Sequence, residues 1–155
     1  MFQFEKCFIM LCDNLTEEEC LRRNLFGDKA RRLQDLSDIN LGDIGFLLNF
    51  DKDELIGIFR ACSEPRLHIE PDAWGGKFGA QVCVEPIGEL RRIKDAAFVL
   101  QKAGVGMRQL KSGAPAPCSS IYGQDVGEKI LAHFGEPIKL RNLCRPWRLA
   151  KEIGV

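Results

Sequence analysis

Short apolar runs separated by polar turn residues gather between residues 45 and 84, and this stretch predicts the centre of a β-sheet. Two apolar runs, 45–50 and 55–61, flank the polar link Asp51-Lys52-Asp53, a pattern typical of a β-hairpin. A third strand is expected to begin at Phe78. Because strand side chains alternate, the residues predicted to share one face of each strand are Phe46, Leu48 and Phe50, then Leu55, Gly57, Phe59 and Ala61, then Phe78, Ala80, Val82 and Val84.

The segments on either side predict further elements. The run 4–12 reads as a buried strand, and the helix 17–24 follows a capping box formed by Thr16 and Glu19, with Gly27 expected to end the helix. Pro86 and Gly88 predict an irregular link after the third strand. The remaining expectations are helices at 29–36, 95–103 and 124–134, a short strand at 90–93, a loop at 111–120, and a terminal helix started by Pro146.

The length of the chain indicates one globular domain, and its balanced charge indicates no strong electrostatic field around the whole molecule. The chain has 155 residues, 45% of them apolar, and equal numbers of basic and acidic side chains, 22 each. The distribution is uneven: residues 1–78 hold ten Lys/Arg and fifteen Asp/Glu, whereas residues 79–155 hold twelve and seven. A basic surface on the later half is one interpretation, and a solvated mixed surface is the other.

The seven cysteines argue against a disulfide framework and against a zinc site. Their number is odd and no two are spaced as C-x-x-C. We therefore expect no metal and no cofactor. The opening segment lacks the pattern of a secretory signal, and no apolar run is long enough to span a membrane, so a reducing cytoplasmic location is expected.

Trp74 is the leading candidate for a binding residue. It lies beside Gly75 and Gly76 in the long loop 63–76 between the second and third predicted strands. A plain structural role, in which the indole covers the core, is the alternative. The chain shows neither a nucleophile elbow nor a glycine-rich phosphate loop, and no acid–base pair stands out, so an enzyme is the class that the sequence supports least.

Four motifs in residues 7–85 resemble the DCD domain, named for development and cell death. They are FIMLCDNLTEEECLRRNLFG, the Leu25-Phe26-Gly27 stop within it, GFLLNFDKDELIGIF, and AWGGKFGAQV. The DCD domain is similar to the PUA-like class, beside the EVE, ASCH and YTH families. The resemblance implies an α+β fold, a PUA-like twisted mixed β-sheet or pseudo-barrel flanked by helices. We interpret 1–155 as a single domain, with 7–85 as its DCD-like core and 86–155 as an extension packed on that core.

The same resemblance implies a ligand pocket beside the sheet. YTH domains hold a methylated adenine in an aromatic cage, and the positions here that correspond are Trp74 and either Leu25 or Phe26. Asp13 and Asn14 fall in the turn that reads the base edge. Lys77 neighbours the tryptophan loop and completes the predicted ligand-binding set. Phosphates of a bound strand would need cations, for which Arg91, Arg92 and Lys94, and the basic tail 139–151, are the candidates.

Three functions follow, in order of support. The first is non-enzymatic binding of a nucleobase or modified nucleotide, in RNA or DNA, through an aromatic pocket near Trp74. The second is a protein–protein interaction module of the stress or cell-death signalling type. The third is a ribonuclease like those suggested among ASCH relatives. The expected partners are RNA or a modified nucleotide, protein partners under the second reading, and no membrane.

Overall fold

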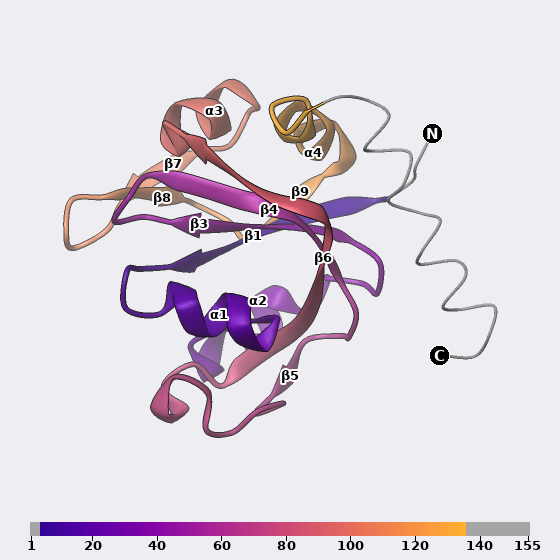
Figure 1. The fold of residues 1–155 in the computed structure, drawn as a ribbon, viewed down its shortest axis with the longest axis vertical. Coiled ribbons are helices and arrows are strands. Elements are labelled where there is room, and N and C mark those ends of the chain that lie inside the picture. The colour runs from indigo at the N-terminus through magenta and orange to yellow at the C-terminus, as the bar shows by residue number, and fades with distance from the viewer. Residues whose placement is uncertain (1–3, 136–155) are drawn as a thin grey trace.

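A computed structural model of the chain describes residues 4–135 and shows an α+β fold built on a strongly curved, mixed sheet (Figure 1). Its strand order is β2-β6-β4-β3-β1-β9, with β5 also paired to β6, and a separate pair β7-β8. The strands are β1 Lys6–Cys12, β2 Leu25–Asp28, β3 Ile44–Asn49, β4 Glu54–Ala61, β5 Arg66–Leu67, β6 Ala80–Lys94, β7 Met107–Gln109, β8 Pro115–Pro117 and β9 Ile121–Gly123. The helices are α1 Glu17–Arg23, α2 Leu33–Leu36, α3 Ala96–Lys102 and α4 Gln124–Leu131, with 3-10 turns at Ala30–Arg32 and Ala73–Gly76.

The predicted hairpin is confirmed as the antiparallel pair β3–β4. β1 runs parallel to β3, which makes the sheet mixed. The third strand is also confirmed, but β6 is longer than predicted and continues through Pro86 and Gly88 to Lys94. The expected irregularity lies inside it: Gly57 pairs with Arg91 and Phe59 with Pro86, so residues 87–90 bulge out of the ladder. The short strand predicted at 90–93 is therefore the second half of β6.

A second irregularity, between β4 and β3, corrects the predicted face of β4. Gly45 pairs with Phe59 and Leu47 with Ile56, so β4 has one extra residue there. Leu55 and Ile58 pack on one side of the sheet, whereas Phe59 and Ala61 pack on the other. An extra residue in a strand shifts the alternation by one position, so side chains beyond it change faces. The sequence pattern alone gives no sign of that shift, because both faces of β4 are buried.

Two hydrophobic clusters lie on opposite faces of the sheet. The first, here called the α1-side cluster, is covered by α1 and α2 and is centred on Phe8, Phe26 and Phe59. The second, the α3-side cluster, is covered by α3 and α4 and contains Phe46 and Phe134 stacked at 5.5 Å between ring centroids. Figure 1 shows α3 and α4 above the sheet and α1 and α2 below it. Helices on both faces explain why β3 is buried at every position.

Several local expectations need correction. α1 ends at Asn24, which takes the left-handed conformation (φ 51°), so Gly27 does not end the helix and instead lies in β2. The Thr16 hydroxyl makes no capping bond to the helix. Part of the predicted loop 111–120 forms β8, which pairs with β7. The helices predicted at 95–103 and 124–134 are confirmed as α3 and α4.

The helix expected at Pro146 and the basic tail 139–151 lie outside the described residues. Between residues 4 and 135, no helix is long and apolar enough to cross a membrane.

Candidate binding pocket

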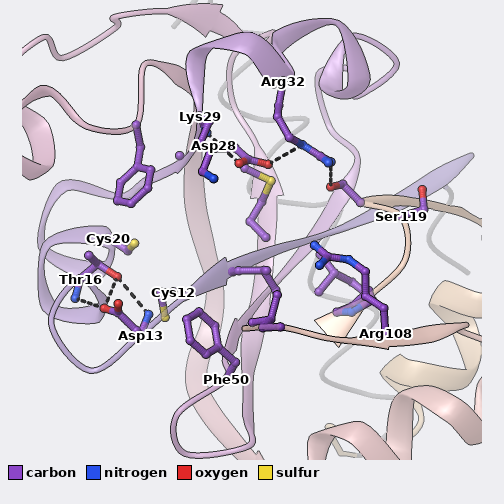
Figure 2. Close-up of a pocket in the computed structure, with 18 of the residues that line it drawn as sticks. Cys12, Asp13, Thr16, Cys20, Asp28, Lys29, Arg32, Phe50, Arg108 and Ser119 are labelled. Carbon is purple, nitrogen blue, oxygen red and sulfur yellow. Dashed lines mark hydrogen bonds and ion pairs between the residues drawn. The ribbon is translucent and has the colours of Figure 1, made fainter. Parts of the chain in front are cut away.

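A pocket of about 560 Å³ opens at the edge of β1 on the α1 side of the sheet (Figure 2). One wall is the second half of β1 and the turn after it, and a second wall is the segment 27–32 that follows β2. The third wall comes from the β7–β8 hairpin and the loop 117–120. The pocket therefore joins three segments that are far apart in the sequence.

The open edge of β1 explains why a pocket forms here. β9 pairs with β1 only at residues Lys6 to Phe8, and one further bond, from the Ile9 N–H to the Ser120 carbonyl at 2.8 Å, follows. Beyond Ile9 the outer edge of β1 has no strand partner within the described chain, and residues 9–13 line the pocket. Backbone groups at an unpaired strand edge are ready hydrogen-bonding partners for a ligand.

The turn after β1 contributes two polar residues, Asp13 and Thr16, to the lining of this pocket. Asp13 Oδ1 accepts the N–H groups of Leu15 and Thr16, each at 2.9 Å, and the Thr16 hydroxyl at 3.0 Å. The Thr16 hydroxyl oxygen in turn accepts the Asp13 N–H at 3.0 Å. The second carboxylate oxygen, Oδ2, makes no hydrogen bond with any described residue. One oxygen of Asp13 thus fixes the turn, and the other is free to accept a hydrogen bond from a ligand.

Trp74 lines the pocket, although most of its surface is covered. Its side chain is 6% exposed and belongs to the α1-side cluster. A Cβ placed on Gly27 would lie 2.5 Å from the indole Cζ3, so the ring packs closely over that glycine. Phe78 meets the indole edge-to-face, with ring centroids 5.8 Å apart. The indole therefore has both of the roles considered from the sequence: it covers the core, and it also lines a cavity.

The indole N–H of Trp74 is a buried donor without a hydrogen bond of ordinary geometry. Burial raises the pKa of the nearby Cys20 thiol to about 12. The contact with the Trp74 N–H acts in the opposite direction but is the smaller effect. Burial likewise raises the pKa of the Cys12 thiol. Both pocket thiols are therefore protonated at neutral pH and are weak hydrogen-bonding groups, not thiolate nucleophiles.

Leu25 and Phe26, predicted as cage residues, do not line the pocket. Both are completely buried in the α1-side cluster. Phe26 meets Phe59 edge-to-face at 4.9 Å and Phe8 at 6.3 Å between ring centroids. Phe26 pairs with Val82 of β6, and both side chains pack in the α1-side cluster. The aromatic residues that do line the pocket are Trp74, Phe78 and Phe50.

Asn14 and Lys77 also lie outside the pocket lining. The Asn14 N–H donates to Asp51 Oδ2 at 2.9 Å, and its side-chain oxygen accepts Asn49 Nδ2 at 3.2 Å. These bonds tie the β1–α1 turn to the β3–β4 turn, which is a structural role. Lys77 is exposed after the tryptophan turn.

The predicted phosphate contacts on β6 are placed elsewhere as well. Arg91 Nη1 donates to the Phe134 carbonyl at 3.0 Å, and Lys94 is exposed on the strand. Arg92 pairs with Glu17 at 2.8 Å and Glu54 at 3.1 Å. The two arginines are thus committed to partners within the protein, and none of the three cations lines the pocket.

The Glu17–Arg92 pair anchors α1 to the sheet. Hydrogen bonding to Arg92 is the main cause that lowers the pKa of Glu17 to about 2, and Asn49 Nδ2, which donates at 2.9 Å, adds to it. Burial of the carboxylate acts in the opposite direction. The start of α1, and with it the Asp13 turn, is held in place by this pair.

Cations from two other segments surround the pocket. Lys29 and Arg31 lie on one rim, and Arg108 and Lys111 lie on the opposite rim in and after β7. All four are exposed and have no ion pair or side-chain hydrogen bond with a described residue. None of the four was predicted as a site residue, because basic residues without a motif give no sign in the sequence of whether they line a pocket.

Arg32 joins the two rims. Its Nη2 donates to the Ser120 hydroxyl at 3.2 Å, while its guanidinium lies 3.1 Å from Asp28 (Figure 2). Ser120 is also the residue whose carbonyl accepts the Ile9 N–H. The loop that follows β8 is thereby fixed against both β1 and the 28–32 segment. In the described residues, no group of three or more metal-ligating side chains is positioned to hold a metal ion.

The fold has known counterparts among YTH domains. The YTH domain of Zygosaccharomyces rouxii MRB1 protein, solved with N6-methyladenosine RNA, superposes with a TM-score of 0.60 over 85% of this chain and 88% of its own, at 14% identity. The Toxoplasma CPSF4 YTH domain, solved with an m6A-modified RNA, gives a TM-score of 0.58 over 83% and 89%, at 13% identity. The chain therefore has a fold of the YTH type within the PUA-like class.

Sequence similarity then gives the family. Residues 6–101 match the development and cell death domain, and the chain belongs to that family. The B2 protein of Daucus carota is 37% identical over 70 residues, and the DCD domain-containing protein NRP-B of Glycine max is 39% identical over the same length. Each alignment spans 45% of this chain but only 34% and 21% of the relative, so the chain spans about a third or less of these curated relatives.

Proposed function

We propose that this protein binds a single base of a nucleic acid strand, with RNA as the favoured form, in the pocket at the β1 edge, without catalysing a reaction. The observation that carries the proposal is that Asp13, whose Oδ2 has no hydrogen bond with a described residue, lines a pocket together with the aromatic residues Trp74, Phe78 and Phe50. An aromatic surface contributes about 1–3 kcal/mol per stacked base, whatever the base. A pocket of this size is accessible only to an unpaired or flipped base.

The likeness to YTH domains supports the choice of ligand. Two of the solved neighbours hold RNA that carries N6-methyladenosine, and they share the sheet that forms the pocket wall here. In this chain Phe26 is buried in the core, and Trp74 packs on Gly27 and meets Phe78 edge-to-face. The base would therefore contact Trp74 and Phe78 at an angle to each other and not between two parallel rings.

The carboxylate of Asp13 predicts which bases bind well. An acceptor without protons favours a base edge that offers an amino or imino N–H, as adenine, guanine and cytosine do and an unmodified uracil does less. A polyuridine strand carrying one variable base near its centre is the suitable probe. We expect the strand with a variable purine or cytosine to bind more tightly than polyuridine itself.

Asp13→Asn tests the assignment sharply. Asparagine keeps the oxygen that accepts the Leu15 and Thr16 N–H groups, so the turn survives, but it replaces the free acceptor by an N–H₂ donor. We expect the base preference to change while the melting temperature changes little. Asp51→Asn is the matched control, because Asp51 accepts the Asn14 N–H close by and does not line the pocket. Unchanged base preference in Asp13→Asn, measured by fluorescence anisotropy, would refute the proposal.

A further inference from the structure

The second rim of the pocket comes from a part of the chain beyond the family match. The match to the development and cell death domain ends at residue 101, whereas Arg108, Lys111 and the loop 117–120 follow it. β7 and β8 pair only with each other and are not strands of the main sheet. Residues 107–120 nonetheless reach the pocket, because Ser120 is bonded to Ile9 and Arg32.

The charges of the two rims are unbalanced. The residues that line the pocket include five basic side chains, Lys29, Arg31, Arg32, Arg108 and Lys111, and two acidic ones, Asp13 and Asp28. Asp28 is paired with Arg32, and Asp13 has one oxygen bound in its own turn. The four cations without partners therefore line the pocket from two separate segments, with little compensation from carboxylates. Unpaired cations on both sides of a pocket in a chain of zero net charge indicate a polyanionic ligand.

We infer that residues 107–120 form one half of a phosphate clamp, with Arg108 and Lys111 opposite Lys29 and Arg31, and that the ligand is an oligonucleotide strand and not a free nucleoside or mononucleotide. Two rims separated by the pocket match phosphates on either side of one inserted base. This inference rests on the proposed function for the position of the base, but the phosphate contacts can be measured without it.

The experiment compares two double variants of the full chain. Arg108→Gln with Lys111→Gln removes the second rim, and Lys102→Gln with Lys129→Gln removes two exposed cations of α3 and α4, on the opposite face of the sheet. Equal charge changes make the second variant a control for overall charge. Thermal unfolding verifies that both variants fold like the parent.

Binding of a labelled single-stranded RNA of about nine nucleotides is measured between about 50 and 200 mM salt. Each cation lost from a single-strand interface lowers the slope of log K against log salt by about 0.7, so the rim variant should lose about 1.4 units of slope. We also expect its affinity at low salt to fall about tenfold or more, whereas the control pair stays within about twofold of the parent. Parent-like slope and affinity in the rim variant would overturn the clamp.

An abasic strand of the same length separates the clamp from the base site. If the rim variant binds both the abasic and the normal strand more weakly than the parent does, the phosphate clamp is supported. If the parent binds the two strands equally well, the base pocket is refuted, but the clamp is not. A nucleoside monophosphate that binds the parent as tightly as the strand would contradict the oligonucleotide assignment. Polyglutamate that binds as tightly as RNA would also contradict it, since the ligand would then be an acidic protein.

Discussion

The Glu19 carboxylate accepts the backbone N–H of Trp74 at 2.7 Å and so ties α1 to the loop that carries the indole. Trp74 needs such a tie, because its backbone lies in the left-handed region (φ 50°), which costs a non-glycine residue about 1–2 kcal/mol. Arg23 adds a second link, since it pairs with Glu19 at 2.9 Å and with Glu70 at 2.5 Å. Residues of α1 thus help to hold the loop that carries the indole.

Glu19→Ala should release this loop. We expect a loss of about 1–3 kcal/mol in the free energy of unfolding, because the Trp74 N–H and Arg23 both lose an acceptor. Affinity for RNA should fall as well, since the indole would leave its place at the pocket. Glu18→Ala is the matched control: Glu18 lies one position earlier on the helix and, among residues 4–135, forms an ion pair only with the exposed Arg22. Urea unfolding of both variants checks the prediction, and equal stabilities would contradict it.

Trp74→Phe should weaken both folding and ligand binding, because the indole packs in the α1-side cluster and lines the pocket. A smaller ring retains part of the packing on Gly27 and Phe78, so we expect a loss of about 1–3 kcal/mol in stability, against about 3–5 kcal/mol for Trp74→Ala. The second tryptophan, Trp147, can be replaced by phenylalanine so that the fluorescence reports Trp74 alone. Addition of single-stranded RNA should then quench or shift this emission. An emission unaffected by saturating RNA would show that the base does not contact the indole.

Gly27→Ala should displace the indole. The added Cβ would meet two indole carbons at 2.5 and 2.8 Å, closer than atoms can approach, and the ring cannot yield as a flexible side chain does. Overpacking of this kind costs about 1–3 kcal/mol in stability. Gly106→Ala is the control, because its Cβ would meet only the Cys118 sulfur at 3.7 Å. Thermal unfolding and RNA affinity should both change in the first variant and neither in the second.

Glu17 should make stability depend on pH in the acid range. Its pKa in the folded protein, about 2, is lower than its ordinary value of 4.5, so the stabilisation is complete above about pH 4.5 and is lost as the pH falls toward 2. The loss should amount to about 1–3 kcal/mol, because part of the carboxylate is exposed. Glu17→Gln should be less stable than the parent at pH 7 and nearly as stable at pH 2.5. Parallel stability curves for the two proteins would contradict the assignment.

The sequence predicted the elements better than their connections. Short continuous apolar runs located β3 and β4, because a strand with helices on both faces of its sheet buries side chains on both faces. The alternation of Phe78, Ala80, Val82 and Val84 located the start of β6. The bulge at 87–90 was visible only as Pro86 and Gly88, which also fit a plain link. The helix α1 ends at Asn24 and not at the predicted Gly27. Asparagine and glycine both accept the left-handed conformation at a helix end, so the sequence does not distinguish the two positions.

The site was harder to predict than the fold. Trp74 and Asp13 do line the pocket, whereas Phe26 and Arg92 point to partners inside the protein. Whether an aromatic or a cation faces a cavity depends on the packing of distant segments, and no local pattern records that. Arg108 and Lys111 illustrate the difficulty: they reach the pocket only because the loop at Ser120 is bonded to β1.

β6 passes from one face of the fold to the other, and this has a consequence for how the protein unfolds. Its first residues hold β2 and the tryptophan loop, and its later residues pair with β4 and lead into α3. Neither hydrophobic cluster can lose this strand without exposing the other to water. We therefore expect denaturation to be cooperative, with the emission of Trp74 and the far-ultraviolet circular dichroism changing at the same urea concentration.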